Sequence, residues 1–213
     1  SEEKKDANME ASGQMNLFGC EEKNAFLGIA VASGEEDICF VQAGETLSSE
    51  KILSLFTKSQ AAEYLTLDLK PQIALLQMLE RKSNGSVSQE NLSDLTIAAY
   101  LLNPLKNEYP YEDIAKDYAN LLIPSRADLL GKLTFDTAME EKPEEFLKTV
   151  CFTAYTAFAG EKAMMEELRE TGMEELYRKI EMPLVYTLYD MQRAGIGCLI
   201  CSRRGLHTGN LSN

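Results

Sequence analysis

Apolar residues in this chain change their spacing from the first half to the second, and this change limits the folds that the chain can adopt. Short apolar runs at residues 26–32, 38–42 and 64–68 have the length and composition of β-strands. From residue 94 onward, apolar residues recur every three or four positions, as on one face of an α-helix. Strands near the beginning and helices in the second half predict a layered α/β or α+β domain.

The first half predicts a hairpin followed by a strand-to-helix unit. The polar residues 33–36 separate the first two runs, a pattern that is typical of a β-hairpin. Ser48 or Ser49 is placed to cap the next helix. After the third run, Pro71 favours the first turn of a helix over residues 72–80.

The second half predicts four helices. They span residues 94–102, 111–121, 143–170 and 173–195. Asn103-Pro104 ends the first helix, Gly172 separates the last two, Pro183 predicts a kink and Gly195 the end. In the 143–170 helix the residues expected to face inward are Phe146, Val150, Ala154, Ala157 and Phe158. In the last helix one apolar stripe is expected along Met173, Leu176, Tyr177, Ile180, Leu184, Leu188 and Met191.

A chain of 213 residues that is 45% hydrophobic is long enough for one packed domain. Residues 1–24 are polar and predict a disordered acidic linker. The domain is expected over residues 25–196, and an irregular tail over residues 197–213. No run of eighteen apolar residues and no apolar leader is present, so the chain is predicted to be cytoplasmic, with no membrane partner.

The net charge of the chain is −13 at pH 7. Tight binding to nucleic-acid phosphates normally depends on clustered Lys and Arg, and a negative field repels phosphates. We therefore expect weak or no DNA binding by this chain alone.

The five cysteines are scattered and odd in number, which favours reduced thiols over a disulfide framework. Cys198, Cys201 and His207 have the spacing of half of a zinc site. A closed tetrahedral site requires four ligands, and the sequence offers no fourth donor nearby, so a zinc site is not expected. His207 is the sole histidine, which also argues against histidine-based catalysis.

The segment from residue 180 to residue 196 resembles the helix that leads into the polymerase module of bacterial family A DNA polymerases. It contains Glu181-Met182-Pro183-Leu184 and ends in Gly195-Ile196. Weaker matches precede it in the same order as in that family: residues 28–31, Asp68-Leu69-Lys70, Asp94 with residues 98–103, and residues 111–115. Together they resemble the 3′–5′ exonuclease-like, proofreading domain of these polymerases.

The resemblance implies a fold and a setting. The fold is an α/β, ribonuclease H-like exonuclease fold, in which a short mixed sheet is flanked by helices and the C-terminal half is rich in helices. The setting is DNA replication and repair, with the polymerase module of a parent chain as partner. The sequence stops at Asn213, before any polymerase motif, so we expect a truncated fragment.

Active members of that family cleave the 3′-terminal phosphodiester with two divalent metals, which four carboxylates and a tyrosine hold. Asp68 and Asp94 are the residual candidates here. The first motif, Asp-x-Glu, is missing around residues 13–15, and Gln72 stands where the second motif has an acid. No carboxylate occurs from residue 146 to residue 160, where Tyr-x-x-x-Asp is expected. We therefore predict a vestigial domain without catalytic residues or a metal cofactor, which serves as a scaffold.

A second resemblance lies in the predicted linker. Gln14-Met15-Asn16-Leu17-Phe18 resembles the pentapeptide that binds the bacterial sliding clamp. In that interpretation Leu17 and Phe18 fill an apolar pocket, Gln14 hydrogen-bonds at its rim, and Met15 takes the aliphatic position. The same residues also fit an edge strand at the start of the domain.

Two other functions remain open. One is an active exonuclease that uses Mg²⁺ or Mn²⁺, with rearranged ligands from Asp68, Asp94 and an acid such as Glu36 or Asp37. The other is an acidic, helical protein-interaction domain. Approach of a third acid to Asp68 and Asp94 would favour the exonuclease.

Overall fold

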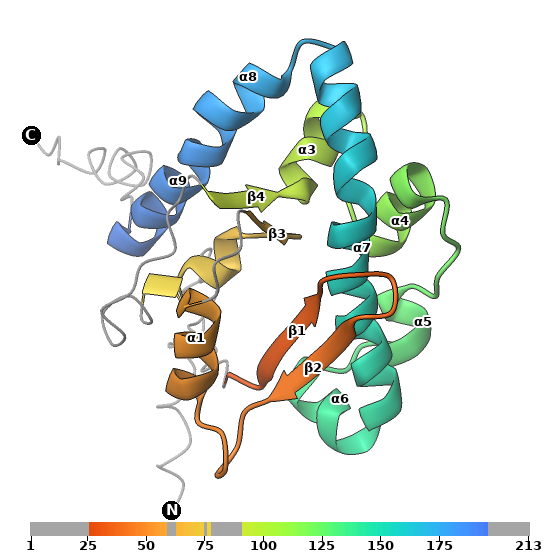
Figure 1. Cartoon of the computed structure of the whole chain (residues 1–213), viewed down its shortest axis with the longest axis vertical. Helices are drawn as coiled ribbons and strands as arrows, with labels where there is room; N and C mark the ends of the chain where they lie inside the picture. Colours follow the sequence, from red (N-terminus) through yellow and green to blue (C-terminus); the bar gives the residue numbers. More distant parts are fainter. Residues whose placement is uncertain (1–25, 59–62, 75, 78–90, 196–213) are drawn as a thin grey trace, which may run out of the picture.

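A computed structural model describes residues 26–58, 63–74, 76–77 and 91–195 of the chain. Figure 1 shows them as short strands and more numerous helices around one long helix, α7, which confirms the mixed α/β class. The strands are β1 (Gly28–Ala32), β2 (Ile38–Gln42), β3 (Tyr64–Thr66) and β4 (Leu92–Asp94). The helices are α1 (Ser49–Lys58), α3 (Leu95–Leu102), α4 (Tyr111–Ala119), α5 (Arg126–Leu130), α6 (Phe135–Glu141), α7 (Pro143–Glu170), α8 (Glu174–Leu176) and α9 (Met182–Ala194). A 3₁₀ turn, η1, spans Lys70–Gln72, and a π-helical turn spans Tyr177–Glu181.

Helix α7 is the element on which most of the described elements pack. Pro143 suits its first turn, where no backbone N–H is needed, and Gly172 follows it with a φ of +73° that favours glycine. Its buried residues are Phe146, Thr149, Thr156, Ala157, Gly160, Met164, Met165 and Leu168. Phe158, which the sequence predicts to face inward, is exposed and stacks on Tyr155. The bounds of this helix agree with the prediction from sequence.

The hairpin predicted from sequence is confirmed. Strands β1 and β2 pair antiparallel over all five residues of each. The ring of Phe40 in β2 meets the ring of Phe146 in α7 edge to face, with 5.4 Å between the ring centroids. Phe146 also packs with the buried residues Leu130 and Ala138, which completes a small core beneath the hairpin.

Strands β3 and β4 form a separate, parallel pair in which Thr66 lies opposite Asp94. The sequence predicts β3 from the alternating run over residues 64–68, but it does not predict β4, because the short segment Leu92–Asp94 shows no such alternation. The described strands therefore form two pairs instead of the one short mixed sheet that the resemblance implies. Both pairs contact α7, which links them in place of backbone hydrogen bonds.

The larger core lies between the β3–β4 pair, α3, α4, α7 and the last helical segment. Its most deeply buried large side chains are Leu69, Ile73, Leu95, Ile114, Met164, Met165, Leu168 and Tyr177. Leu69 and Ile73 flank η1, so this core fixes the turn that follows β3.

Helices α5 and α6 are absent from the sequence prediction. Each begins at a capping residue: Ser125 accepts the N–H of Asp128 in a capping box, and Thr134 accepts the N–H of Thr137. With five and seven residues, these helices are too short for a clear helical period.

The last helical segment buries a different face from the one expected. It breaks into α8, the π-helical turn and α9 close to Pro183, which has no N–H to continue the α-helical pattern. Its buried side chains are those of Tyr177, Met182 and Val185. Most of the predicted stripe is instead exposed, with exposed fractions from 36% to 56%: Leu176, Ile180, Leu184, Leu188 and Met191. Gly195, with a φ of +70°, ends α9 as predicted.

Two further features concern the surface. No described helix combines the length and apolar character that a membrane span needs.

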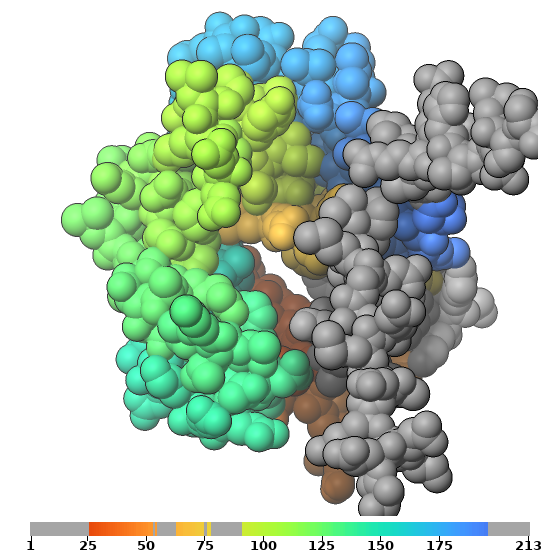
Figure 2. All heavy atoms as spheres, turned by 180° about the vertical axis from the view of Figure 1, so that it is seen from behind, coloured from red at the N-terminus to blue at the C-terminus, as the bar shows by residue number. Residues whose placement is uncertain are grey.

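The face opposite to that of Figure 1 is hollowed near its centre (Figure 2), and residues 91–145, coloured lime to blue-green, border the hollow on one side. Gold atoms, which belong to residues 63–74 and 76–77, also border the hollow.

Candidate functional site

Asp68 and Asp94, the two acids singled out by the sequence, lie at the same edge of the β3–β4 pair. Asp68 follows the end of β3 by two residues, and Asp94 is the last residue of β4. The strands are parallel, so their carboxyl ends meet at one edge. The backbone N–H of Asp68 donates to Oδ1 of Asp94 at 3.1 Å, so the structure brings these two residues together.

Both carboxylate oxygens of Asp94 accept backbone N–H groups. Oδ1 accepts the N–H of Asp68 and, at 2.9 Å, that of Thr96, while Oδ2 accepts the N–H of Leu69 at 2.7 Å. The bond from Thr96 makes Asp94 the N-cap of α3. Burial raises the pKa of Asp94, the three N–H groups act to lower it, and the nearby Asp68 adds to the increase. Asp94 therefore fastens the end of β3 to the start of α3.

The backbone of Asp94 is held in turn by the last helical segment. The hydroxyl of Tyr177 donates to the carbonyl of Asp94 at 3.2 Å, and the N–H of Asp94 lies 3.4 Å from Sδ of Met182. Tyr177 has no exposed surface, so this bond is made in the core. The sequence predicts Tyr177 as an apolar stripe residue and gives no signal for its polar contact across more than eighty residues.

Asp68 has a left-handed backbone, with a φ of 56°, and an exposed side chain. Its N–H also donates to Oγ1 of Thr96 at 3.0 Å. Partial burial raises the pKa of Asp68, and Lys70 opposes this increase. The carboxylate of Asp68 thus faces solvent while its backbone is tied to α3.

Gln72 closes the turn after β3. Its Nε2 donates to Oγ1 of Thr66 at 2.9 Å and to the carbonyls of Leu67 and Asp68, each at 3.1 Å. An ionised carboxylate has no hydrogen to donate, so an acid at this position could not make these bonds. The Gln72 amide therefore has a structural role that a carboxylate, expected at this position from the resemblance, could not fill.

The middle of α7 presents no acid to this region. From residue 146 to residue 160 the side chains are apolar, hydroxyl-bearing or a single Lys. Thr156 and Ala157 are buried there, and Gly160 faces Ile114 and Tyr118 of α4. This face of α7 is thus used for packing.

Among the residues that the structure describes, no third acid joins Asp68 and Asp94 in a group that could hold a metal ion. Glu36 and Asp37 lie in the exposed connection between β1 and β2. Within the described ranges, no group of three or more His, Cys, Asp or Glu residues is placed to hold a metal ion. The described residues at the edge of β3–β4 therefore do not fit the two-metal centre that the resemblance implies.

Several residues predicted from sequence lie outside the described part of the chain. They are the predicted clamp-binding residues Gln14, Met15, Leu17 and Phe18, and the tail residues Cys198, Cys201 and His207. Of the described cysteines, Cys39 and Cys151 are free thiols.

Comparison of the chain with protein-family models, with curated proteins and with solved structures finds no match.

Proposed function

We propose that this chain is a non-catalytic, exonuclease-like domain of a bacterial family A DNA polymerase, and that it acts as a structural scaffold in DNA replication and repair. The observation that carries the proposal is the hydrogen bonding of Asp94, whose two carboxylate oxygens accept three backbone N–H groups. A carboxylate that bridges two hard cations needs its lone pairs for the metals. Here they hold the backbone.

Gln72 supports the same proposal. It stands where the resembling family has a metal-binding acid, and it donates to Thr66, Leu67 and Asp68. The amide of Gln72 donates the hydrogen bonds that stabilise the turn after β3. Because it replaces a carboxylate, this position lacks the negative charge that a metal site requires.

The proposed partner of the scaffold is the polymerase module of the parent chain. The exposed apolar residues Ile180, Leu184, Leu188 and Met191 lie on the helix that would lead into that module. Contiguous exposed apolar surface of this kind favours a protein interface.

A nuclease assay tests the loss of catalysis. The purified chain is incubated with 3′-labelled single-stranded DNA and Mg²⁺ or Mn²⁺, with a chelator as control. We expect no chelator-sensitive release of nucleotides. Release that Asp68→Ala abolishes would overturn the proposal, and this variant is the cleaner one because the side chain of Asp68 is exposed. Asp94→Ala would also remove the bonds that hold β3.

Clamp tethering is the second part of the proposal. Gln14, Leu17 and Phe18 have the pattern of a clamp-binding peptide, and a bacterial sliding clamp should bind the chain through them. Biosensor binding of the wild-type chain is compared with that of the double variant Leu17→Ala and Phe18→Ala, which we expect to bind no clamp. Equal binding by the double variant would refute clamp tethering.

A further inference from the structure

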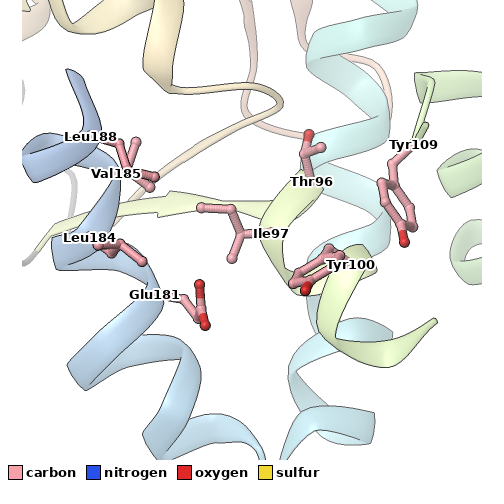
Figure 3. Close-up of a pocket in the computed structure, with 8 residues that line it drawn as sticks. All are labelled: Thr96, Ile97, Tyr100, Tyr109, Glu181, Leu184, Val185 and Leu188. Atoms are coloured by element: carbon pink, nitrogen blue, oxygen red, sulfur yellow. The ribbon is translucent and has the colours of Figure 1, made fainter. Parts of the chain in front are cut away.

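An apolar groove runs between α3 and α9 (Figure 3). Its volume is about 250 Å³, and it is lined by Thr96, Ile97, Tyr100, Tyr109, Glu181, Leu184, Val185 and Leu188. Tyr100, Leu184 and Leu188 keep 47%, 39% and 44% of their surface exposed, so the groove offers apolar surface to a partner.

The aromatic wall of the groove is held in place by the fold. The rings of Tyr100 and Tyr109 meet edge to face, with 6.3 Å between their centroids. The hydroxyl of Tyr109 donates to the carbonyls of Asn103 at 2.6 Å and Lys106 at 3.1 Å. This wall therefore needs little ordering when a partner binds, which favours affinity.

The exposed stripe gives the length of the surface. Leu184 and Leu188 line the groove, and Ile180 and Met191 continue the same exposed row in either direction. At a rise of about 1.5 Å per residue, the row from Ile180 to Met191 is about 17 Å long, or roughly three helical turns.

The secondary structure of the groove walls indicates which backbone conformation a bound partner adopts. Most of the lining residues lie on α3, on α9 or in the π-helical turn before α9, and Tyr109 lies in the connection between α3 and α4. None of the lining residues belongs to a strand, so an extended peptide would find no strand edge to pair with here. A helix satisfies its own backbone groups and inserts side chains at helical spacing into such a groove.

The charge of the groove determines the polar character of the occupant. Glu181 is the one charged residue among those that line it. Among the described residues, no cation pairs with Glu181, while Arg178 and Lys179 pair with Glu63, Glu174 and Glu175. A second copy of the chain has the same net charge of −13 and would be repelled, whereas a basic partner would be attracted.

We infer that this groove binds a basic amphipathic helix of a protein partner, about three turns long. The apolar residues of the bound helix pack on Tyr100, Leu184 and Leu188, and a Lys or Arg side chain of that helix faces Glu181. The inference rests on the proposed function for the role of this surface as an attachment face, and it deepens that function by specifying the chemistry of the partner.

The test uses the whole chain and a labelled synthetic peptide of about fourteen residues, cross-linked to be helical, with Leu along one face and Lys on the other. Fluorescence anisotropy should show saturable binding. Leu184→Glu and Leu188→Glu should each weaken it at least about tenfold. Leu147→Glu is the matched control, because Leu147 of α7 is 42% exposed and does not line the groove, and it should bind like the wild type. Far-UV circular dichroism checks that each variant is folded.

Variants of the peptide test the inference on the unchanged protein. Replacing the Lys residues by Glu should weaken binding, and Glu181→Gln should weaken the binding of the Lys peptide about two- to fivefold at low salt. A scrambled peptide of the same composition should not bind.

Three outcomes would overturn the inference. They are equal binding by the Leu184→Glu and Leu147→Glu variants, equal binding of the Glu and Lys peptides, and dimerisation of the chain, measured by analytical ultracentrifugation, that Leu188→Glu abolishes. Nuclease release on the same preparation separates this test from the proposed function. Release with groove-dependent peptide binding would refute the loss of catalysis alone, and no release with no peptide binding would refute the groove alone.

Discussion

Asp94 shows how the surroundings of a side chain decide its role. The sequence singles it out as a residual metal ligand, because an acid stands at that position in the resembling family. In the structure its carboxylate holds Asp68, Leu69 and Thr96, and its backbone is held by Tyr177. The sequence alone was enough to single out Asp94 as a candidate site residue. It could not predict the hydrogen-bond partners of Asp94, because partners such as Asp68 and Tyr177 lie far from it in the chain.

The first prediction concerns this residue. Asp94→Ala leaves the N–H groups of Leu69 and Thr96 without their acceptor, takes from the N–H of Asp68 one of its two acceptors, and removes the N-cap of α3. We expect the free energy of unfolding to fall by about 2–4 kcal/mol, measured by urea denaturation. Asp136→Ala, which removes an exposed acid from the first turn of α6, is the control and should cost below about 1 kcal/mol. Equal losses for both variants would contradict the role of Asp94.

Elements were predictable from sequence where their signals are local and long enough. The hairpin and α7 have clear runs, turns and end residues, whereas β4, α5 and α6 are too short to show a period. The last helical segment has apolar residues on two faces, Tyr177 with Val185 and Leu184 with Leu188. Periodicity reveals that a stripe exists, but only packing decides which stripe is buried, so the groove could not be foreseen.

The second prediction concerns the hairpin. A Cβ at Gly28 would lie 2.3 Å from the carbonyl oxygen of Val41 and 2.6 Å from the ring of Phe40, and its φ of +156° disfavours other residues. Gly28→Ala should therefore lower the free energy of unfolding by about 2–4 kcal/mol. Gly44→Ala, at the end of the same hairpin, adds a Cβ with nothing within 4 Å and serves as the control. A thermal unfolding midpoint of Gly28→Ala equal to that of Gly44→Ala would contradict the packing described.

At the scale of the whole molecule, two cores share one helix. The small core under the hairpin contains Phe146, the larger core contains Met164 and Leu168, and all three residues belong to α7. Damage at either core is therefore expected to reach the other through α7, and the described part of the chain should unfold as one cooperative unit.

The third prediction concerns the alkaline stability of the whole chain. Burial raises the pKa of Tyr111 from 10.0 to about 12, helped by the charges of Glu112 and Asp128, and burial likewise raises the pKa of Tyr177. The unfolded chain thus loses these protons at a lower pH than the folded chain does. The stability they contribute is complete below pH 10 and is lost as the pH rises through the folded pKa.

Urea denaturation near neutral pH and between about pH 10 and pH 12 measures this effect. Tyr111→Phe should cost about 1 kcal/mol at neutral pH, because the carbonyl of Pro124 loses its donor, and should make the alkaline fall in stability shallower. Parallel alkaline profiles for Tyr111→Phe and the wild type would refute the assignment.

The contact between the hairpin and α7 also bears on how the protein is made. Phe40 and its partner Phe146 are separated by roughly a hundred residues, and ribosomes add about 5–20 residues per second. During translation the newly made hairpin waits roughly 5–20 seconds for the helix that covers it. An isolated two-stranded hairpin is marginal in water, so its apolar face is open to chaperones and to other nascent chains throughout that interval. The hairpin, although it is made early, therefore stays uncovered until α7 has been synthesised.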